Sequence, residues 1–493
     1  MYNSIIKLLE SRGYQAYISG ETARDIYLNK TPKQHHVAVA APFTELQKQF
    51  KEFIVASDSH TTILKFNYRN SLFFIRPLQQ IKLDHTYCSY KYTDSFETDA
   101  YHRGYTIDAL YYNPIKGTWL NFHNAKADIE NKVIKLINGK ASLLESKVRL
   151  LRGPVLAGTL GDGWKLSAKA HTHIKDFHLK VIMAHSSQIR QELTALLGHC
   201  TSPSKVFNIL RSTKVLEILF PELLLCVGIP QSNKRANLDL YQHIMYALDS
   251  VKPTQTNSVV IRLAALLHDI AKPHTQIETE TGMHFYSHEI VGAMLTERIL
   301  FRWGFPKPLI AKVALLVRNH LFDAYAKVPL KNIRKLIARI GPTNIHDLID
   351  LRIADRHGTG RKDISMKKVY AFRERVNKEL AKISPAQFKL RLTEDAIYKY
   401  IRYSTDSPRD AVLPIQTYLE NKVLYGRLAN KTANLKRAIR TINKIKCPLD
   451  KAHLFKTWTS ILKDDPEIFE DGKLKCGVYC NFICDKLKNE PNT

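Results

Sequence analysis

The spacing of apolar residues changes once along the chain, near residue 143, and this change limits the folds that the chain can adopt. Before it, apolar runs are short and of strand length, as at 62–66 and 72–75, with helical stretches between them. After it, apolar residues recur every three or four positions, as at 259–271 and 310–320. The sequence therefore predicts an α+β chain, in which a mixed α/β N-terminal domain precedes all-helical regions.

The charge of the chain indicates a polyanionic partner. The 493 residues include 74 Lys and Arg against 46 Asp and Glu, a formal net charge of 74 − 46 = +28. Such a surplus favours nucleic acid, because phosphates attract it at long range. A membrane surface is the weaker alternative, since we find no basic amphipathic or lipidated anchor, no run of 18 apolar residues and no signal-peptide core. We expect a cytoplasmic protein, whose seven cysteines are reduced thiols.

Four ordered segments of the first 152 residues resemble one family. They are the segment 19–28 with Gly20, Arg24 and Asp25, the segment 31–38, the segment 99–110 with Arg103, and the segment 145–152 with Arg149 and Arg152. They resemble the palm of the CCA-adding tRNA nucleotidyltransferase and poly(A) polymerase family. The resemblance implies that these retained positions bind nucleotide or RNA: Gly20, Arg24, Asp25, Arg103, Arg149 and Arg152.

The departures from that family concern the catalytic acids. Gln34 and His36 stand where the family has Asp-x-Asp, two carboxylates that project from one face of a strand and hold magnesium. An amide is a weak magnesium ligand, and imidazole prefers softer ions, so we expect no magnesium in this domain. Glu21, Gly104 and Ser146 also replace family residues: a loop glycine, an aspartate and the aspartate that reads the base. The sequence predicts a degenerate palm that keeps its fold. A shifted metal site using Asp99, Asp108 or a histidine is the alternative.

A histidine and aspartate series lies between residues 236 and 357. It reads, in order, His243, His268 with Asp269, His288, His320 and Asp355. Imidazole nitrogens with an aspartate bind mid-row divalent ions such as Mn, Ni, Co, Fe or Zn. The order resembles the HD-domain metal phosphohydrolases, in the version with ligands for two metals.

The resemblance implies metal ligation by these six residues, and catalysis by His268, Asp269 and Lys272. His284, near His288, is a second-choice ligand. Each histidine taken alone is better explained as a hydrogen-bonded core or helix-end residue, and it is their order, with the His-Asp pair on an apolar helix, that favours metal binding.

The C-terminal helices continue the resemblance. Residues 413–430 are similar to the closing helix of the family, and basic runs such as 367–368 and 431–446 are interleaved with tyrosines including Tyr398 and Tyr400. These runs fit an RNA backbone, but they equally fit solvated faces of amphipathic helices. We expect four domains: a degenerate palm at 1–140, a helical neck that binds RNA and nucleotide at 141–230, an HD domain at 236–357 and an RNA-binding helical region at 361–493.

Three functions are compatible with this organisation. The first is an HD phosphohydrolase that acts on nucleotides or RNA ends, with the palm as a platform for RNA such as tRNA or RNA 3′ ends. The second is an active RNA nucleotidyltransferase. The third is a non-catalytic RNA-binding protein. The histidine series separates the first from the third, and the loss of Asp-x-Asp separates the first from the second.

Overall fold

The computed structural model describes most of the chain, namely residues 1–58, 62–84, 87–230, 238–280, 282–325, 327–361, 363–382, 390–400, 412, 415–416, 419, 423, 431–443, 469–470 and 473–474. The chain forms two compact units. The first comprises Met1–Ala324 and His346–Val369, and the second comprises Tyr325–Ile345 and Tyr370–Thr493. The four predicted domain boundaries stay a prediction, and two expected junctions, 231–234 and 446–448, lie outside the described residues.

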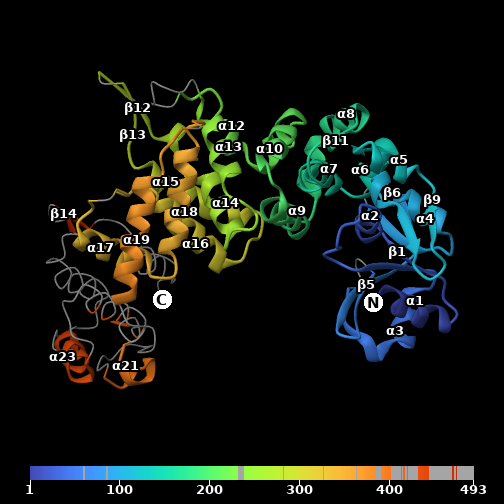
Figure 1. Cartoon of the computed structure of the whole chain (residues 1–493), viewed down its shortest axis with the longest axis horizontal. Coiled ribbons are helices and arrows are strands. Elements are labelled where there is room, and N and C mark those ends of the chain that lie inside the picture. The colour runs from blue at the N-terminus through green and yellow to red at the C-terminus, as the bar shows by residue number, and fades with distance from the viewer. Residues whose placement is uncertain are drawn as a thin grey trace, which may run out of the picture. The chain divides into compact units, whose positions relative to one another are not determined.

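The first unit begins with a mixed seven-stranded sheet (Figure 1), in the order β3-β4-β5-β2-β1-β8-β9. Strands β2 and β5 pair in parallel, and the other neighbours are antiparallel. The predicted α/β N-terminal domain is confirmed. The strands are β1 (Ala16–Ser19), β2 (His36–Val39), β3 (Ile54–Asp58), β4 (Ile63–Tyr68), β5 (Ser71–Pro77), β8 (Leu110–Asn113) and β9 (Thr118–Asn121), and β6 (Gln79–Asp84) and β7 (Tyr87–Tyr92) form a separate hairpin.

A hydrophobic core covers each face of this sheet. Adjacent residues of a strand point to opposite faces, so neighbouring residues of β1 enter different cores. Ile18 of β1 belongs to a core that includes Ile5 and Leu9 of α1 (Tyr2–Ser11). Tyr17, the preceding residue, belongs to a second core with Phe96 of α4 (Phe96–Tyr101). The remaining helical elements here are α2 (Glu21–Tyr27), α3 (Phe43–Gln49), η1 (Lys51–Phe53), η2 (Thr106–Asp108) and α5 (Ala125–Glu130).

Helices follow from residue 139 onward, as the apolar spacing predicts. The apolar spacing at 155–166 also predicts a helix there, but α7 ends at Thr159, and residues 165–166 form β11 (Lys165–Leu166), which pairs in parallel with β10 (Val133–Ile134). Glycines 161 and 163, both at positive φ, supply the turn between helix and strand. The other elements are α6 (Gly139–Glu145), α7 (Arg149–Thr159), α8 (Ala168–Phe177), η3 (His178–Met183), α9 (Ser186–His199), α10 (Pro203–Ser212), α11 (Leu216–Leu219) and α12 (Pro221–Leu224).

The last part of the first unit is a helical bundle with one hairpin. Its elements are α13 (Leu240–Ser250), α14 (Ser258–Leu267), η4 (Lys272–His274), β12 (Gln276–Thr279), β13 (Gly282–Phe285), α15 (His288–Arg302), α16 (Lys307–Arg318) and α18 (Ile345–His357). The guanidinium of Arg262 on α14 is fully buried and donates to the carbonyls of Val251 and Leu197, at 2.7 and 2.8 Å. It thereby joins α14 to the end of α9 with charge-assisted hydrogen bonds.

The second unit is also helical. Its described elements are α17 (Leu330–Ile340), most of α19 (Lys367–Lys382), α21 (Glu394–Tyr400), α23 (Thr432–Asn443) and the short strands β14 (Phe469–Glu470) and β15 (Lys473–Leu474). Lys436 lies over the ring of Tyr400, with 4.9 Å between the ammonium and the ring centroid. Within the residues that the structure describes, no helix is both long and apolar enough to cross a bilayer.

The packing of α7 against the sheet domain depends on the absence of a side chain at Gly153. A Cβ there would lie 2.2 Å from the hydroxyl oxygen of Tyr105, which donates a hydrogen bond of 2.6 Å to the carbonyl of Arg149. We expect Gly153→Ala to lower the free energy of unfolding by about 1–3 kcal/mol, because overpacking forces the buried ring to move.

The matched control is Gly198→Ala, whose Cβ would meet one methyl group at an ordinary 3.5 Å. It should cost nothing, since alanine favours helix over glycine. Urea unfolding followed by circular dichroism compares the two variants. Equal stability of both would contradict the described packing of Tyr105.

Candidate metal centre

Six side chains that the sequence singles out come from five different helical segments and meet in the first unit. Each lies within or just beyond a helix, and five of them are buried, with Asp355 partly so. His243 lies on α13, His268 and Asp269 directly follow α14, His288 begins α15, His320 follows α16, and Asp355 lies on α18.

Local sequence explains how these helices begin and end. Asp239 and Gln242 form a capping box that starts α13, one residue before His243. The predicted end of α14 at His268 is confirmed, with His268 as its C-cap residue and Pro273 in the short η4 that follows. The sequence Ser287-His288 also predicts that the Ser287 hydroxyl caps α15, but Ser287 has φ +59° and its side chain makes no capping hydrogen bond, so this prediction is wrong.

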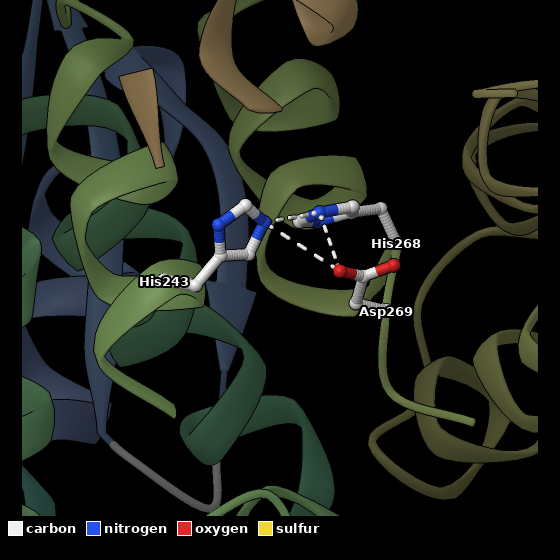
Figure 2. Close-up of side chains that lie close together, drawn as sticks. All are labelled: His243, His268 and Asp269. Carbon is white, nitrogen blue, oxygen red and sulfur yellow. Dashed lines mark hydrogen bonds and ion pairs between the residues drawn. The ribbon is translucent and has the colours of Figure 1, made fainter. Parts of the chain in front are cut away.

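A first group of ligand atoms surrounds one oxygen of Asp269. The Nε2 atoms of His243 and His268 are 3.1 Å apart, and they lie 3.5 and 3.3 Å from Asp269 Oδ2. Figure 2 shows both imidazoles turned toward each other and toward this carboxylate. Asp355 Oδ1 is 3.4 Å from the Nε2 atom of His243 and 3.6 Å from that of His268. Two imidazoles and two carboxylates therefore converge on one point.

A second group surrounds the other oxygen of the same carboxylate. Asp269 Oδ1 lies 3.3 Å from His288 Nε2 and 3.6 Å from His320 Nε2. His288 Nε2 is buried and has no hydrogen-bond partner in the described structure. A buried nitrogen without a partner is energetically unfavourable unless a ligand binds it, so His288 Nε2 is a good candidate to coordinate a metal ion.

The tautomers of three histidines fit metal binding. The Nδ1 atoms of His268, His288 and His320 lie 2.8, 2.7 and 2.7 Å from the backbone carbonyls of residues 265, 285 and 317. A carbonyl only accepts, so each Nδ1 donates a proton, and in the neutral ring the Nε2 lone pair faces the centre. Backbone carbonyls commonly orient metal-binding histidines in this way.

The electrostatics of the centre show an excess of negative charge. Burial favours neutral His268, but the charges of Asp269 and Asp355 outweigh this effect and raise its pKa to about 10. Burial likewise favours protonated Asp269, yet His268 and Lys272 hold the pKa of that carboxyl well below its usual range. Lys272 Nζ lies 2.7 Å from Asp269 Oδ2. Burial also opposes ionisation of Asp355, a partly buried carboxyl, but His243 and His268 hold its pKa low, and two carboxylates that stay ionised suit a divalent cation.

The second-choice ligand falls outside these groups. His284 lies on β13 and stacks on Tyr286, with 5.5 Å between ring centroids. Among the described residues, two groups of three side chains could hold a metal, and both contain Asp269. One group includes His243 and His268, and the other includes His288 and His320.

The positions of the Asp-x-Asp pair in the N-terminal domain hold a different cluster. His36 Nε2 lies 3.0 Å from the side-chain oxygen of Gln34 and 3.4 Å from Glu21 Oε1. Burial opposes ionisation of Glu21, but the hydrogen bond from His36 and the charge of Arg152 lower the pKa of that carboxyl. The three substituted positions thus satisfy one another.

The retained basic positions of this domain are also paired internally. Arg24 contacts Asp108 and lies 3.4 Å from Asp25. Arg152 contacts Glu21 at 2.9 Å and Glu192 of α9 at 3.1 Å. The structure therefore brings Arg24 and Arg152 close to the Glu21, Gln34 and His36 cluster, where carboxylates of the chain pair with both arginines.

Arg149 and Glu145, in the segment that resembles the family's base-selecting motif, lie close to Gly104. Gly104 has φ +91°, and a Cβ on it would lie 2.4 Å from Arg149 Nε, so Arg149 fills the space beside the missing side chain. Arg149 donates to the carbonyl of Ser142 at 2.8 Å and to Glu145 at 2.9 Å, and Glu145 also binds His102 at 2.9 Å. The predicted base-reading arginine faces its own domain.

The alternative of a shifted metal site receives no support from Asp99. This buried carboxylate accepts hydrogen bonds from Arg76, Arg103, Tyr111 and the backbone of Gln79, at 2.6–3.1 Å. Arg103 lies beside the loop of Gly20, where a Cβ would be 3.4 Å from its Nη1. These bonds saturate the acceptor positions of Asp99, which therefore has a structural role here.

Two residues that contact candidate site residues, Glu192 and Arg352, are not predicted from the sequence. Glu192, the partner of Arg152, is 40 residues distant along the chain, so no local pattern indicates it. Arg352 donates to Asp355 Oδ2 at 2.7 Å, and its position one helical turn before a predicted ligand is a signal that could have identified it.

Comparison with known proteins agrees with this geometry. Residues 16–135 match the poly A polymerase head domain, and residues 236–360 match the HD domain. The chain is 29% identical over 274 residues to a CC-adding tRNA nucleotidyltransferase of Thermus thermophilus, covering 53% of this chain and 60% of that protein. It is 25% identical to a multifunctional CCA protein of Pasteurella multocida, covering 55% of this chain and 66% of the relative. The chain thus spans less than two thirds of these relatives' lengths.

Solved structures share the fold. A CCA-adding enzyme of Bacillus stearothermophilus in complex with CTP superposes with a TM-score of 0.59 at 14% identity, covering 90% of this chain and 96% of that one. The chain therefore combines a polymerase-type head with an HD domain. Its sequence is similar to tRNA nucleotidyltransferases and its fold is similar to that of a CCA-adding enzyme, in agreement with the resemblance seen in the sequence.

Metal content tests the two groups separately. We expect the purified protein to bind about two divalent ions of the Mn, Co or Ni type, because Asp269 offers one oxygen to each group. His320→Ala should lose one ion and Asp269→Ala both, as measured by elemental analysis after dialysis. His346→Ala, an exposed histidine on the same helix as Asp355, is the control and should lose none. Full metal content in Asp269→Ala would contradict the assignment.

Proposed function

We propose that the chain is a metal-dependent phosphohydrolase of the HD type, which cleaves phosphodiesters or phosphomonoesters of nucleotides or RNA ends. The single observation that carries this proposal is the carboxylate of Asp269, whose two oxygens face two different pairs of histidines. The ligand set is His243, His268, Asp269, His288, His320 and Asp355.

The donor set fits Mn, Co, Ni, Fe or Zn, and such a metal would supply Lewis acidity and a water of lowered pKa to attack phosphorus. The residues of the chain contribute the rest. Backbone carbonyls fix the imidazoles, the two carboxylates balance charge, and Lys272 places beside Asp269 a cation that would stabilise charge developing on a bound phosphoester.

The proposed partners are RNA, tRNA above all, and nucleotides. The net charge of +28 suits a polyanion, and one similar protein is named a CC-adding tRNA nucleotidyltransferase. One solved structure of the same fold, with a TM-score of 0.51 and 18% identity, is described as a tRNA nucleotidyltransferase with a primer tRNA and an incoming ATP analogue. We propose that the head of this chain keeps an RNA-binding role.

We further propose that the head has lost nucleotidyl transfer. Gln34 and His36 offer an amide and an imidazole where two magnesium ions need hard carboxylates. Glu21 adds a negative charge to the loop that follows β1, and it is held there by Arg152. Arg149 is bound by Glu145, and Ser146 lacks the carboxylate of the family position.

An active nucleotidyltransferase is the second candidate. It is favoured by the names of the relatives and by Asp25 and Asp108, two carboxylates that lie within the arginine network of the former site. The same network supports the first proposal, because Arg24 pairs with both acids and leaves them less available to a metal.

Hydrolysis of a 2′,3′-cyclic nucleotide tests the HD proposal. With Mn, Ni or Co present, the wild-type protein should release a nucleoside monophosphate, and EDTA should abolish the reaction. His268→Ala and Asp269→Asn should fall to background, since each removes a donor of the first group, whereas His346→Ala should keep full activity. Hydrolysis that persists in both ligand variants would overturn the proposal.

Nucleotide incorporation tests the head. Given tRNA that lacks its 3′ end, CTP, ATP and magnesium, the wild-type protein should add no nucleotide, because the carboxylate pair is absent. A gel shift on the same preparation should still detect the tRNA. Robust incorporation would refute the loss of transfer and leave the HD proposal to its own assay.

A further inference from the structure

Exposure shows where the HD centre opens to solvent. The side chains of the four histidines and Asp269 are at most 8% exposed, whereas those of Lys272 and Asp355 are 15% and 18% exposed. Lys272 and Asp355 are therefore the side chains of the centre that solvent reaches most, and we call them the mouth of the site.

Arg352 stands at this mouth on the side of Asp355. Its side chain is 28% exposed, and its Nη1 donates a hydrogen bond of 2.7 Å to Asp355 Oδ2. The other oxygen of Asp355 faces His243 and His268. A guanidinium carries five donors in a planar fork, so a bond to one carboxylate oxygen leaves donors for an anion that lies beside it.

Lys272 is less suited than Arg352 to bind an anion of the substrate. It is engaged with Asp269 Oδ2 at 2.7 Å, and its ammonium lies 5.4 Å from the centre of the Phe285 ring. Movement toward an incoming phosphate would remove a cation from the most buried acid of the centre. Arg352, in contrast, binds Asp355, which is already partly exposed to solvent.

We propose that Arg352 contacts a phosphate oxygen of the substrate and is the anion-binding residue of the HD centre. This inference rests on the proposed phosphohydrolase function and deepens it. The same guanidinium holds Asp355 with one oxygen toward the imidazoles, so it orients a residue that would ligate a metal and binds the phosphoester that water would hydrolyse there. The ligand class is a phosphoester dianion or monoanion, for which inorganic phosphate is the simplest probe.

The test measures binding of inorganic phosphate to the Mn²⁺-loaded, full-length protein by calorimetry, with Mn²⁺ affinity measured separately. In Arg352→Gln we expect phosphate affinity to fall about tenfold or more, the loss of one charge-assisted hydrogen-bonded contact. Mn²⁺ affinity should stay within about threefold, because all six donors remain. Arg352→Lys should lie between the two, since it keeps the charge and loses the fork.

The control is Arg361→Gln, which removes an exposed arginine that pairs with Asp363. It should bind phosphate as the wild type does. Unchanged phosphate affinity in Arg352→Gln would overturn the inference, and so would a loss of Mn²⁺ binding in that variant, which would assign Arg352 to ligand support alone. Absence of Mn²⁺ binding or of hydrolysis in the wild type would overturn the proposed function itself.

Discussion

The carboxylate of Asp269 is the interaction on which the rest of the HD region depends. It is a buried acid, and an isolated buried charge is strongly unfavourable. Here its two oxygens lie among four imidazoles and one ammonium. The ends of α14, α15 and α16 are placed by this requirement, because each delivers one nitrogen to the same carboxylate.

The HD region and the head of the first unit differ in how their charged and polar side chains are paired. In the HD region, acids and imidazoles converge with their lone pairs inward, and His288 Nε2 lacks a hydrogen-bond partner in the described structure. In the head, arginines and acids are matched one to another, and Arg152 alone contacts Glu21 and Glu192. An open set of donors invites a ligand, whereas a closed set of ion pairs stabilises a fold. We infer that the chemistry of this chain resides in the HD domain.

Much of this organisation was predictable from the sequence. The strand-length runs before residue 143 and the helical spacing after it give the fold class, and the ordered histidines give the donors. The end of α7 at Thr159 was missed, because apolar residues continue to 166 and the glycines at 161 and 163 were not read as a turn. Ser287 was expected to cap α15 through its hydroxyl, but its left-handed backbone prevents the usual geometry. Arg152 contacts Glu192, and Arg149 lies beside Gly104. Both contacts join segments that are distant along the chain, so no sequence pattern predicts them.

The most direct test of the account is a crystal of the Mn²⁺-loaded protein, with the metal located by its anomalous scattering. The account predicts two peaks on either side of the Asp269 carboxylate, one beside His243, His268 and Asp355 and the other beside His288 and His320, with none at Gln34 and His36. A structure with metal bound in the head and none at Asp269 would contradict it.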